Sequence, residues 1–231
     1  MKRSQINQIL ADAAAFISQH GQYLPGFANW SPDQMVSRVS ADAAQIMDRR
    51  LGWDITDYGD GRFDEMGLFL FTTRNGDLSE RDSGTGMLYA EKIMISRRNQ
   101  LSPMHTHVHK VEDIINKGGA TLAIELFGSD DAGNFAPDRG CTVACDGIAC
   151  TLAPGDKLML APGESVTLRP GDWHAFWGEG GDVLIGEVST VNDDLTDNIF
   201  REPIGRFANI EEDVAPSHLL VADYDNWIKR D

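Results

Sequence analysis

The sequence predicts a mainly β protein, a sandwich, jelly roll or barrel with helices at its N-terminal end. Two observations support this fold class. After about residue 52, short apolar runs of β-prone residues recur, and Gly- or Pro-containing turns separate them. Before that point, apolar residues recur at helical spacing instead. The length of 231 residues suits one domain, residues 1–231, with a helical extension over 1–52, a barrel over about 53–190 and a C-terminal tail over 191–231.

Two amphipathic helices are expected in the N-terminal extension. In the first, apolar residues recur at helical spacing over 6–17, and Gly21 follows as a stop. In the second, Ser31 is the N-cap and Pro32 occupies the first turn, where a missing N–H costs nothing. Its apolar face continues to residue 47, and Gly52 ends it. Both apolar faces predict packing against a core.

The expected strands share short length and β-branched, aromatic or aliphatic composition. They are residues 67–73, 87–96, 121–127, 143–152, 157–160, 165–168, 174–177 and 183–189. In the tail, residues 210–214 are a candidate short helix.

Composition excludes several classes of partner. The net charge of −16 makes the surface acidic, which repels nucleic acid and anionic lipid. No apolar run approaches the roughly 18 residues that a membrane-spanning helix needs. The basic first residues lack the apolar core and cleavage site of a signal peptide. A cytoplasmic protein with no nucleic-acid or membrane partner is therefore expected.

The three cysteines, Cys141, Cys145 and Cys150, contain no CxxC pair. Asp146-Gly147 between them is typical of a hairpin turn, which would place them on two adjacent strands. Their odd number provides no disulfide framework. We therefore interpret them as small buried hydrophobic residues rather than as a zinc site.

Four residues form a plausible ligand set for a divalent metal: His105, His107, Glu112 and His174. The first two lie two residues apart, so on a strand both side chains point to one face. Glu112 follows after a short turn, and His174 begins a later strand just past a Pro-Gly turn. Three neutral imidazoles and a carboxylate would leave one or two positions on the metal open for water or substrate. His109 shares their parity, but the chain should already be turning there, so we expect it outside the ligand set.

These motifs resemble known families. The His-x-His and later Glu, followed by a second Pro-Gly-x-x-His, are similar to the two-part signature of the cupin superfamily, a jelly-roll-like β-barrel with a metal in its lumen. The longer stretch 103–119, together with 169–174 and 191–194, resembles the D-lyxose isomerase family of cupin sugar isomerases. The opening helix and residues 204–207 extend the resemblance over most of the chain.

The resemblance implies a cupin β-barrel with the N-terminal helices packed outside and the tail folded back over it. It also implies interconversion of D-lyxose and D-xylulose, with D-mannose and D-fructose as secondary substrates, a bound Mn²⁺ and a homodimer. Such a reaction moves a proton between C1 and C2 of an open-chain sugar through a cis-enediol, and it needs a base and a group that manages the hydroxyl proton.

Candidates for these roles follow from position. Lys110 lies between two ligands, so it could stabilise an oxyanion, shuttle a proton and contact the sugar. The base is a carboxylate: we favour Glu211 in the tail first and then Glu187, which could point inward from its strand. Arg206 is a candidate for binding sugar hydroxyls. Two further tail carboxylates are Glu202 and Glu212.

Two other functions share this ligand set. An iron-dependent cupin dioxygenase would use the same side chains but consume O₂. A non-enzymatic sugar-binding cupin would bind without turnover, although no DNA-binding element or basic patch indicates a sensor.

Overall fold

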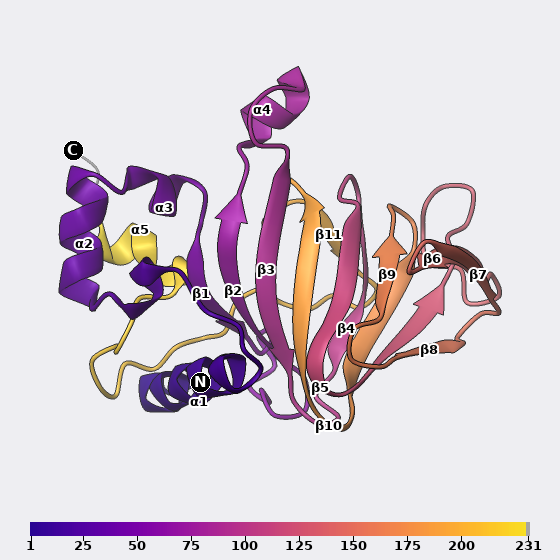
Figure 1. Ribbon diagram of the computed structural model, residues 1–231, viewed down its shortest axis with the longest axis horizontal. Coiled ribbons are helices and arrows are strands. Elements are labelled where there is room, and N and C mark those ends of the chain that lie inside the picture. Colours follow the sequence, from indigo (N-terminus) through magenta and orange to yellow (C-terminus); the bar gives the residue numbers. More distant parts are fainter. Residues whose placement is uncertain (230–231) are drawn as a thin grey trace.

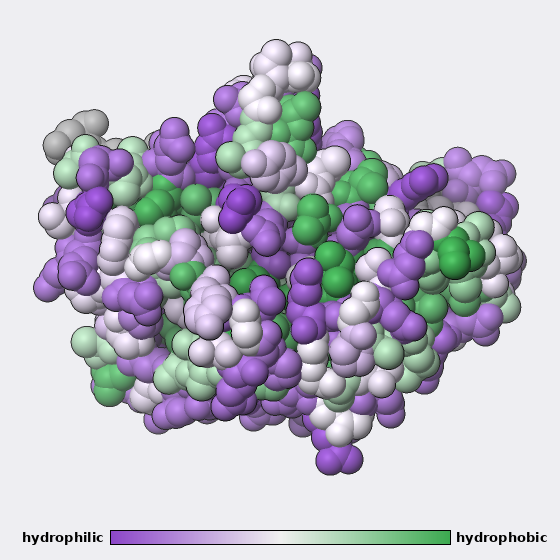
Figure 2. All heavy atoms as spheres, viewed as in Figure 1, coloured by the Kyte–Doolittle hydropathy of each residue, from purple (hydrophilic) through white to green (hydrophobic). Residues whose placement is uncertain are grey.

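The computed structural model describes residues 1–229. It shows a curved sheet of 11 antiparallel strands, with most of the helices gathered beside its first strand (Figure 1). The fold class is the predicted one, mainly β and cupin-like with the N-terminal helices outside. Hydrophilic residues dominate the face in Figure 2, and hydrophobic residues appear there in small groups. None of the helices in residues 1–229 has both the length and the apolar character that crossing a bilayer requires.

The helices lie mostly near the two ends of the chain. They are α1 (Arg3–Gln19), η1 (Gly26–Asn29), α2 (Pro32–Ala41), α3 (Ala44–Asp48), α4 (Leu78–Ser83), η2 (Val221–Asp223) and α5 (Tyr224–Trp227). The strands are β1 (Gly52–Thr56), β2 (Leu68–Asn75), β3 (Tyr89–Ser96), β4 (Ser102–His107), β5 (Glu112–Phe127), β6 (Cys141–Cys145), β7 (Ile148–Leu152), β8 (Lys157–Leu160), β9 (Ser165–Leu168), β10 (Trp173–Thr190) and β11 (Asn198–Phe200).

Strands β5 and β10 form the centre of the sheet. The main path of the sheet runs β1-β2-β3-β10-β5-β9-β6-β7, with β4 beside β10, β11 beside β4, and β8 beside β5. Two of the predicted strands, 174–177 and 183–189, are halves of the single strand β10, and the pairing register shifts between Glu179 and Val183. Opposite this shift, Gly119 has φ +90°, and a Cβ there would collide with the carbonyl oxygen of Asp182. The two long strands therefore bend together at this point.

The two faces of the sheet carry different cores because strand side chains alternate. In β2, Leu68 and Leu70 belong to the inner core, which includes residues of β5 and β10. Their neighbours Phe69 and Phe71 belong to the outer core, where they pack with the apolar face of α1. The cysteines lie on the paired strands β6 and β7, as predicted, and they are half-buried against the inner core rather than fully buried.

The tail is held to α1 by Arg3, whose side chain is fully buried. Its guanidinium donates to Asp223 at 2.8 and 3.0 Å and to Glu212 at 2.6 and 2.8 Å. Burial alone would lower the pKa of Arg3, but the two carboxylates outweigh this effect and raise the pKa above its usual value.

Some element predictions were wrong. The expected second helix is divided into two helices, α2 and α3, because the dihedral angles of Asp42 and Ala43 are not helical. Both helices pack against Leu219 and Tyr224. Residues 210–214 form no helix, since Glu211 instead pairs through its main chain with the start of the chain. Strand β1 and helix α4 were not expected.

We predict that Arg3→Ala lowers the free energy of unfolding by about 3–5 kcal/mol, because it leaves the Asp223 carboxylate buried without its cation. Glu212→Gln is the matched control; this carboxylate is half exposed, so its loss should cost about 1 kcal/mol or less. Urea denaturation of both variants measures the difference. Equal losses would contradict a buried ion pair between Arg3 and Asp223.

Candidate active site

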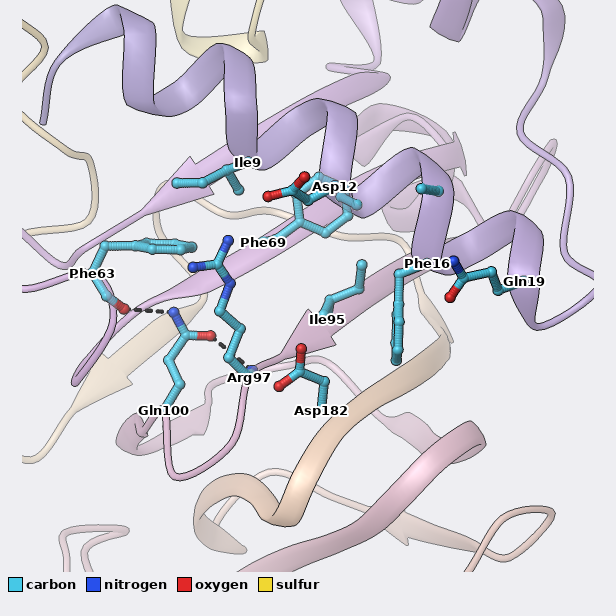
Figure 3. A pocket seen from close by; sticks show the side chains of 12 residues that line it. Ile9, Asp12, Phe16, Gln19, Phe63, Phe69, Ile95, Arg97, Gln100 and Asp182 are labelled. Carbon is cyan, nitrogen blue, oxygen red and sulfur yellow. Dashed lines mark hydrogen bonds between the residues drawn. The ribbon is translucent and has the colours of Figure 1, made fainter.

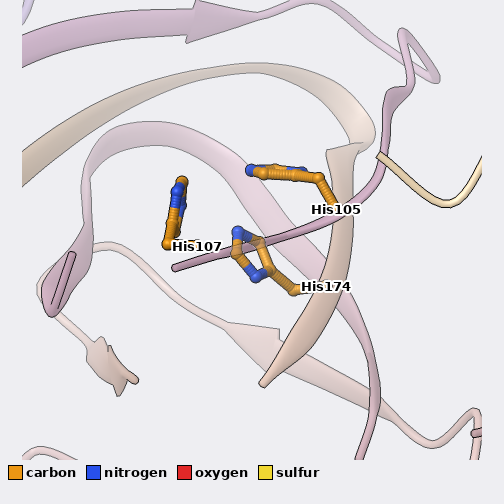
Figure 4. Close-up of side chains that lie close together, drawn as sticks. All are labelled: His105, His107 and His174. Carbon is orange, nitrogen blue, oxygen red and sulfur yellow. The ribbon is translucent and has the colours of Figure 1, made fainter. Parts of the chain in front are cut away.

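The three predicted histidine ligands meet on the inner face of the sheet. His105 and His107 come from β4, and His174 comes from the neighbouring strand β10, where it pairs directly with His105. Figure 4 shows the three rings turned toward one another. One ring nitrogen of each lies within 4.8 Å of the others, the only such cluster of metal-binding side chains found in residues 1–229. Strand parity and antiparallel pairing therefore assemble the triad.

Glu112 begins β5 and joins this group. Its Oε1 lies 3.1 Å from Nε2 of His107 and 3.3 Å from Nε2 of His174, and the residue is only 3% exposed. Atoms that share a metal at about 2.0–2.2 Å stand roughly 3–3.5 Å apart, so these separations fit neighbouring ligands.

The hydrogen bonds of the histidines also fit a metal site. Nδ1 of His105 donates to the carbonyl of Pro103 at 2.8 Å, and Nδ1 of His174 donates to that of Asp172 at 3.0 Å. Those bonds direct the Nε2 lone pairs inward. Nε2 of His174 is buried and has no hydrogen-bond partner among residues 1–229. Burial, together with the other two imidazoles, holds the pKa of His105 well below its usual value, so it is neutral as a ligand must be.

Lys110 and Glu187 lie next to these donors. The ammonium of Lys110 is 2.7 Å from Oε2 of Glu112 and 3.1 Å from Oε1 of Glu187, and all three residues are buried. Burial alone would lower the pKa of Lys110, but the two carboxylates raise it above its usual value. Burial would likewise raise the pKa of Glu112, whereas Lys110 and His107 hold it well below its usual value.

A chain of alternating charges continues from Glu187. Lys92 lies 3.5 Å from Glu187 and 3.2 Å from Asp194, whose carboxylate is 3.5 Å from the guanidinium of Arg206. Arg206 in turn lies 3.6 Å from Asp54. Sequence reasoning missed Lys92, Asp194 and Asp54. A lysine within the apolar run 87–96, two residues from an inward-facing methionine, was the available signal.

Aromatic side chains form the other wall of the cavity. The Phe200 ring is 5.5 Å from the His105 ring and 5.7 Å from the Tyr58 ring, measured between centroids. The Tyr58 hydroxyl and the Ser102 hydroxyl are 2.9 Å apart. Burial raises the pKa of Tyr58 to about 12. Neither aromatic residue was singled out from the sequence.

Asp197 in the tail organises the turn between His107 and Glu112. Its carboxylate accepts hydrogen bonds from the main-chain N–H groups of His109 at 2.8 Å and Lys110 at 3.1 Å. One of its oxygens is also 3.7 Å from Nδ1 of His107. The side chain of His109 is exposed, and it does not belong to the histidine cluster.

The tail carboxylates named from the sequence lie elsewhere. Glu211 is exposed, and its main chain accepts from Arg3 and donates to Met1, both at 2.9 Å. Glu212 pairs with Arg3, and Glu202 is exposed beside Arg201. These three glutamates are not among the described residues that line the cavity, whereas Glu187 and Arg206 are.

A second, larger hollow of about 510 Å³ lies on the other side of the sheet, beneath α1 (Figure 3). Its lining combines apolar side chains such as Phe69 and Ile95 with Asp12, Arg97 and Asp182. No histidine or cysteine of residues 1–229 lines this hollow, whereas the histidine cluster lines the inner cavity.

The chain matches the D-lyxose isomerase family over residues 1–224. It is similar to the D-lyxose/D-mannose isomerase of Serratia proteamaculans, with 46% identity over 230 residues that cover 99% of this chain and 100% of that protein. The D-lyxose/D-mannose isomerase of Escherichia coli O157:H7 is also 46% identical over 230 residues, covering 97% and 98%.

Solved structures show the same fold in more distant proteins. A variant of the L-ribose isomerase from Acinetobacter sp. DL28, solved in complex with L-ribose, aligns with a TM-score of 0.62 and 14% identity over 91% of this chain and 98% of that one. The L-ribose isomerase of Geodermatophilus obscurus aligns over the same shares with a TM-score of 0.56 and 14% identity. At such identities the likeness concerns the fold alone. The family match over residues 1–224 and the 46% identity to full-length relatives show that this protein belongs to the D-lyxose isomerase family.

Proposed function

We propose that this protein is a metal-dependent aldose–ketose isomerase that interconverts D-lyxose with D-xylulose and D-mannose with D-fructose, through a cis-enediol. One observation carries the proposal: a buried lysine–glutamate pair, Lys110 and Glu187, lies directly beside the metal-competent histidines in a family of isomerases. A dioxygenase or a binding protein would not need a carboxylate placed to move a proton between carbons.

His105, His107, Glu112 and His174 would hold the metal. Their nitrogen and oxygen donors, without a thiolate, suit Mn²⁺, which is the ion we propose. When bound, a divalent ion supplies Lewis-acid polarisation of the sugar carbonyl. The fit rests on the convergence of the three histidines, on the contacts of Glu112 with two of them, and on Nε2 of His174, which has no hydrogen-bond partner within residues 1–229.

Glu187 is the base we propose, because it lies in the cavity whereas Glu211 does not. Its carboxylate removes the proton at C2 of the aldose and returns it at C1 of the intermediate. Lys110 donates to Glu187 and lies 2.7 Å from Glu112, and in this proposal its ammonium stabilises the negative charge that develops on the sugar oxygen. Lys110 also binds the sugar in this proposal.

The tail, residues 191–231, supplies part of the lining of the cavity. Asp194, Asn198, Phe200 and Arg206 all line it, so this segment would hold the sugar and exclude water while the proton moves. Arg206 binds sugar hydroxyls in this proposal. We further propose a homodimer in the cytoplasm, on the basis of the family resemblance, and light scattering of the purified protein measures its mass in solution.

We predict that the Mn²⁺-loaded protein converts D-lyxose to a ketose and that His174→Ala removes both the activity and the bound metal. The reason is that the variant lacks one of the converging ligands. Ketose formation and metal content by plasma mass spectrometry are measured on the same samples. Absence of ketose from every pentose and hexose tested would refute the isomerase.

We predict that Glu187→Gln lowers kcat on D-lyxose by about 100- to 10,000-fold, the typical contribution of a general base, while metal content stays unchanged. Glu202→Gln, an exposed carboxylate in the same chain, is the control and should keep wild-type kcat. A larger loss in Glu211→Gln than in Glu187→Gln would transfer the role of base back to the tail.

We predict that Asp197→Ala weakens Mn²⁺ binding by about 10- to 100-fold, because the turn that presents His107 and Lys110 loses its carboxylate acceptor. Competition with a fluorescent chelator measures the affinity. Asp193→Ala is the neighbouring control. Within residues 1–229, the carboxylate of Asp193 accepts hydrogen bonds only from Leu195 and Thr196, in the same turn of the tail. Equal metal affinity in the Asp197 variant and the wild type would exclude this positioning role.

A further inference from the structure

The cavity has two walls that both begin at the histidines. The polar wall is the chain of charges from Glu112 through Lys110, Glu187, Lys92 and Asp194 to Arg206. The aromatic wall consists of Phe200 against His105 and then Tyr58. The two walls meet again, because the main-chain carbonyl of Tyr58 accepts a hydrogen bond at 2.9 Å from the N–H of Gly205, the residue before Arg206, and Tyr58 and Arg206 both line the cavity. The cavity therefore has a metal end at the histidines and a far end at Asp194 and Arg206.

Arg206 has unused donors at the far end. Its Nη2 lies 3.5 Å from Asp194 and 3.6 Å from Asp54, at or beyond the limit of a hydrogen bond. Its buried Nε has no hydrogen-bond partner within residues 1–229. A buried guanidinium donor without an acceptor is costly, so the arrangement is suited to a ligand that supplies oxygen atoms.

Asp194 is the acceptor at the same end. Its side chain is 18% exposed and contacts Lys92 at 3.2 Å through one oxygen, the oxygen that also faces Arg206. Burial alone would raise the pKa of Asp194, but the charges of Lys92 and Arg206 lower it well below its usual value. It therefore presents a carboxylate, the strongest acceptor for a hydroxyl group.

An open-chain sugar matches both ends. Its carbonyl and neighbouring hydroxyl belong at the metal end, where the proton is moved, so its last hydroxyls extend toward the far end. We propose that Asp194 accepts a hydrogen bond from the terminal hydroxyl of the substrate, that Arg206 donates to the hydroxyl before it, and that Asp194 thereby sets the preferred length of the sugar. This inference rests on the proposed isomerase function.

D-Lyxose and D-mannose differ by one hydroxymethyl group at the end remote from the carbonyl. Asp194 lines that end between Lys92 and Arg206, so in the proposed orientation a shorter residue there would leave room for one more carbon. Differences of about one carbon in a fitted pocket change kcat/KM by about 10-fold or more.

The test compares Asp194→Asn, Asp194→Ser and the control Glu202→Gln with the wild type, all loaded with Mn²⁺. Steady-state kinetics are measured on D-lyxose and D-mannose. Binding of the polyols D-arabinitol and D-mannitol, which lack a carbonyl, is measured by calorimetry. Thermal unfolding verifies that each variant is folded, and Arg206→Gln serves as a second variant of the same end if Asp194→Asn does not fold.

We expect Asp194→Asn to weaken D-arabinitol binding and to raise KM for D-lyxose by about 10- to 100-fold, as loss of a charged acceptor does, with kcat changed less than threefold. Asp194→Ser should shift the ratio of kcat/KM for D-mannose over D-lyxose upward by about 10-fold. Glu202→Gln should match the wild type. An Asp194→Asn variant that binds D-arabinitol within twofold of the wild type overturns the inference, as does an unchanged sugar ratio in Asp194→Ser.

The polyol measurements separate this inference from the proposed reaction. Binding of D-arabinitol that depends on Asp194, in a wild type that forms no ketose, would support the recognition of the far hydroxyls and refute the isomerase. Ketose formation with polyol binding that is insensitive to Asp194 and Arg206 would leave the isomerase intact and overturn the inference.

Discussion

The shared bend of β5 and β10 is the constraint on which the site depends. His174 and Glu187 lie on one strand, and in a straight strand they would stand about 40 Å apart. Both nevertheless line the same cavity. The register shift between Glu179 and Val183, opposite Gly119, folds the paired strands over so that both halves of β10 face inward. Without this bend the histidines and the lysine–glutamate pair could not act on one small molecule.

The bend concentrates charge in a buried space, and the alternation of signs makes that tolerable. Asp54, Asp194, Glu187 and Glu112 alternate with Arg206, Lys92 and Lys110 (Asp54 is 3% exposed and Lys92 3%). Each charge has an oppositely charged neighbour, which offsets part of the cost of leaving water. The series begins and ends with a carboxylate, and the one at the histidine end, Glu112, lies beside His107 and His174, so that end is electrostatically suited to a divalent cation.

The tail turns this charged space into an enclosed one. Asp197 accepts from the main chain beside Lys110, and Asn192 accepts from Lys92 at 2.6 Å, so the tail is attached at both the ligand turn and the charge chain. The acceptors that hold the tail are thus next to the residues proposed for catalysis. Family membership and this geometry both support the proposed isomerisation, in which a proton moves between two carbons of a small polar molecule.

The sequence by itself determined the local features. Helical spacing identified α1, and the two-residue spacing of His105 and His107 placed both imidazoles on one face, because each follows from the geometry of a single element. Only the tertiary structure decided which distant residues join them. Parity allowed Glu187 to point inward, but an acidic chain offers many carboxylates. The preference for Glu187 over Glu211 as the proposed base needed the tertiary structure, in which Glu211 pairs through its main chain with Met1 and Arg3. Lys92 and Asp194 are about 100 residues apart in the chain, and the pairing and bending of strands bring them together. The 2.6 Å hydrogen bond from Lys92 to Asn192 is one contact of this kind. No local pattern in the sequence encodes such long-range contacts.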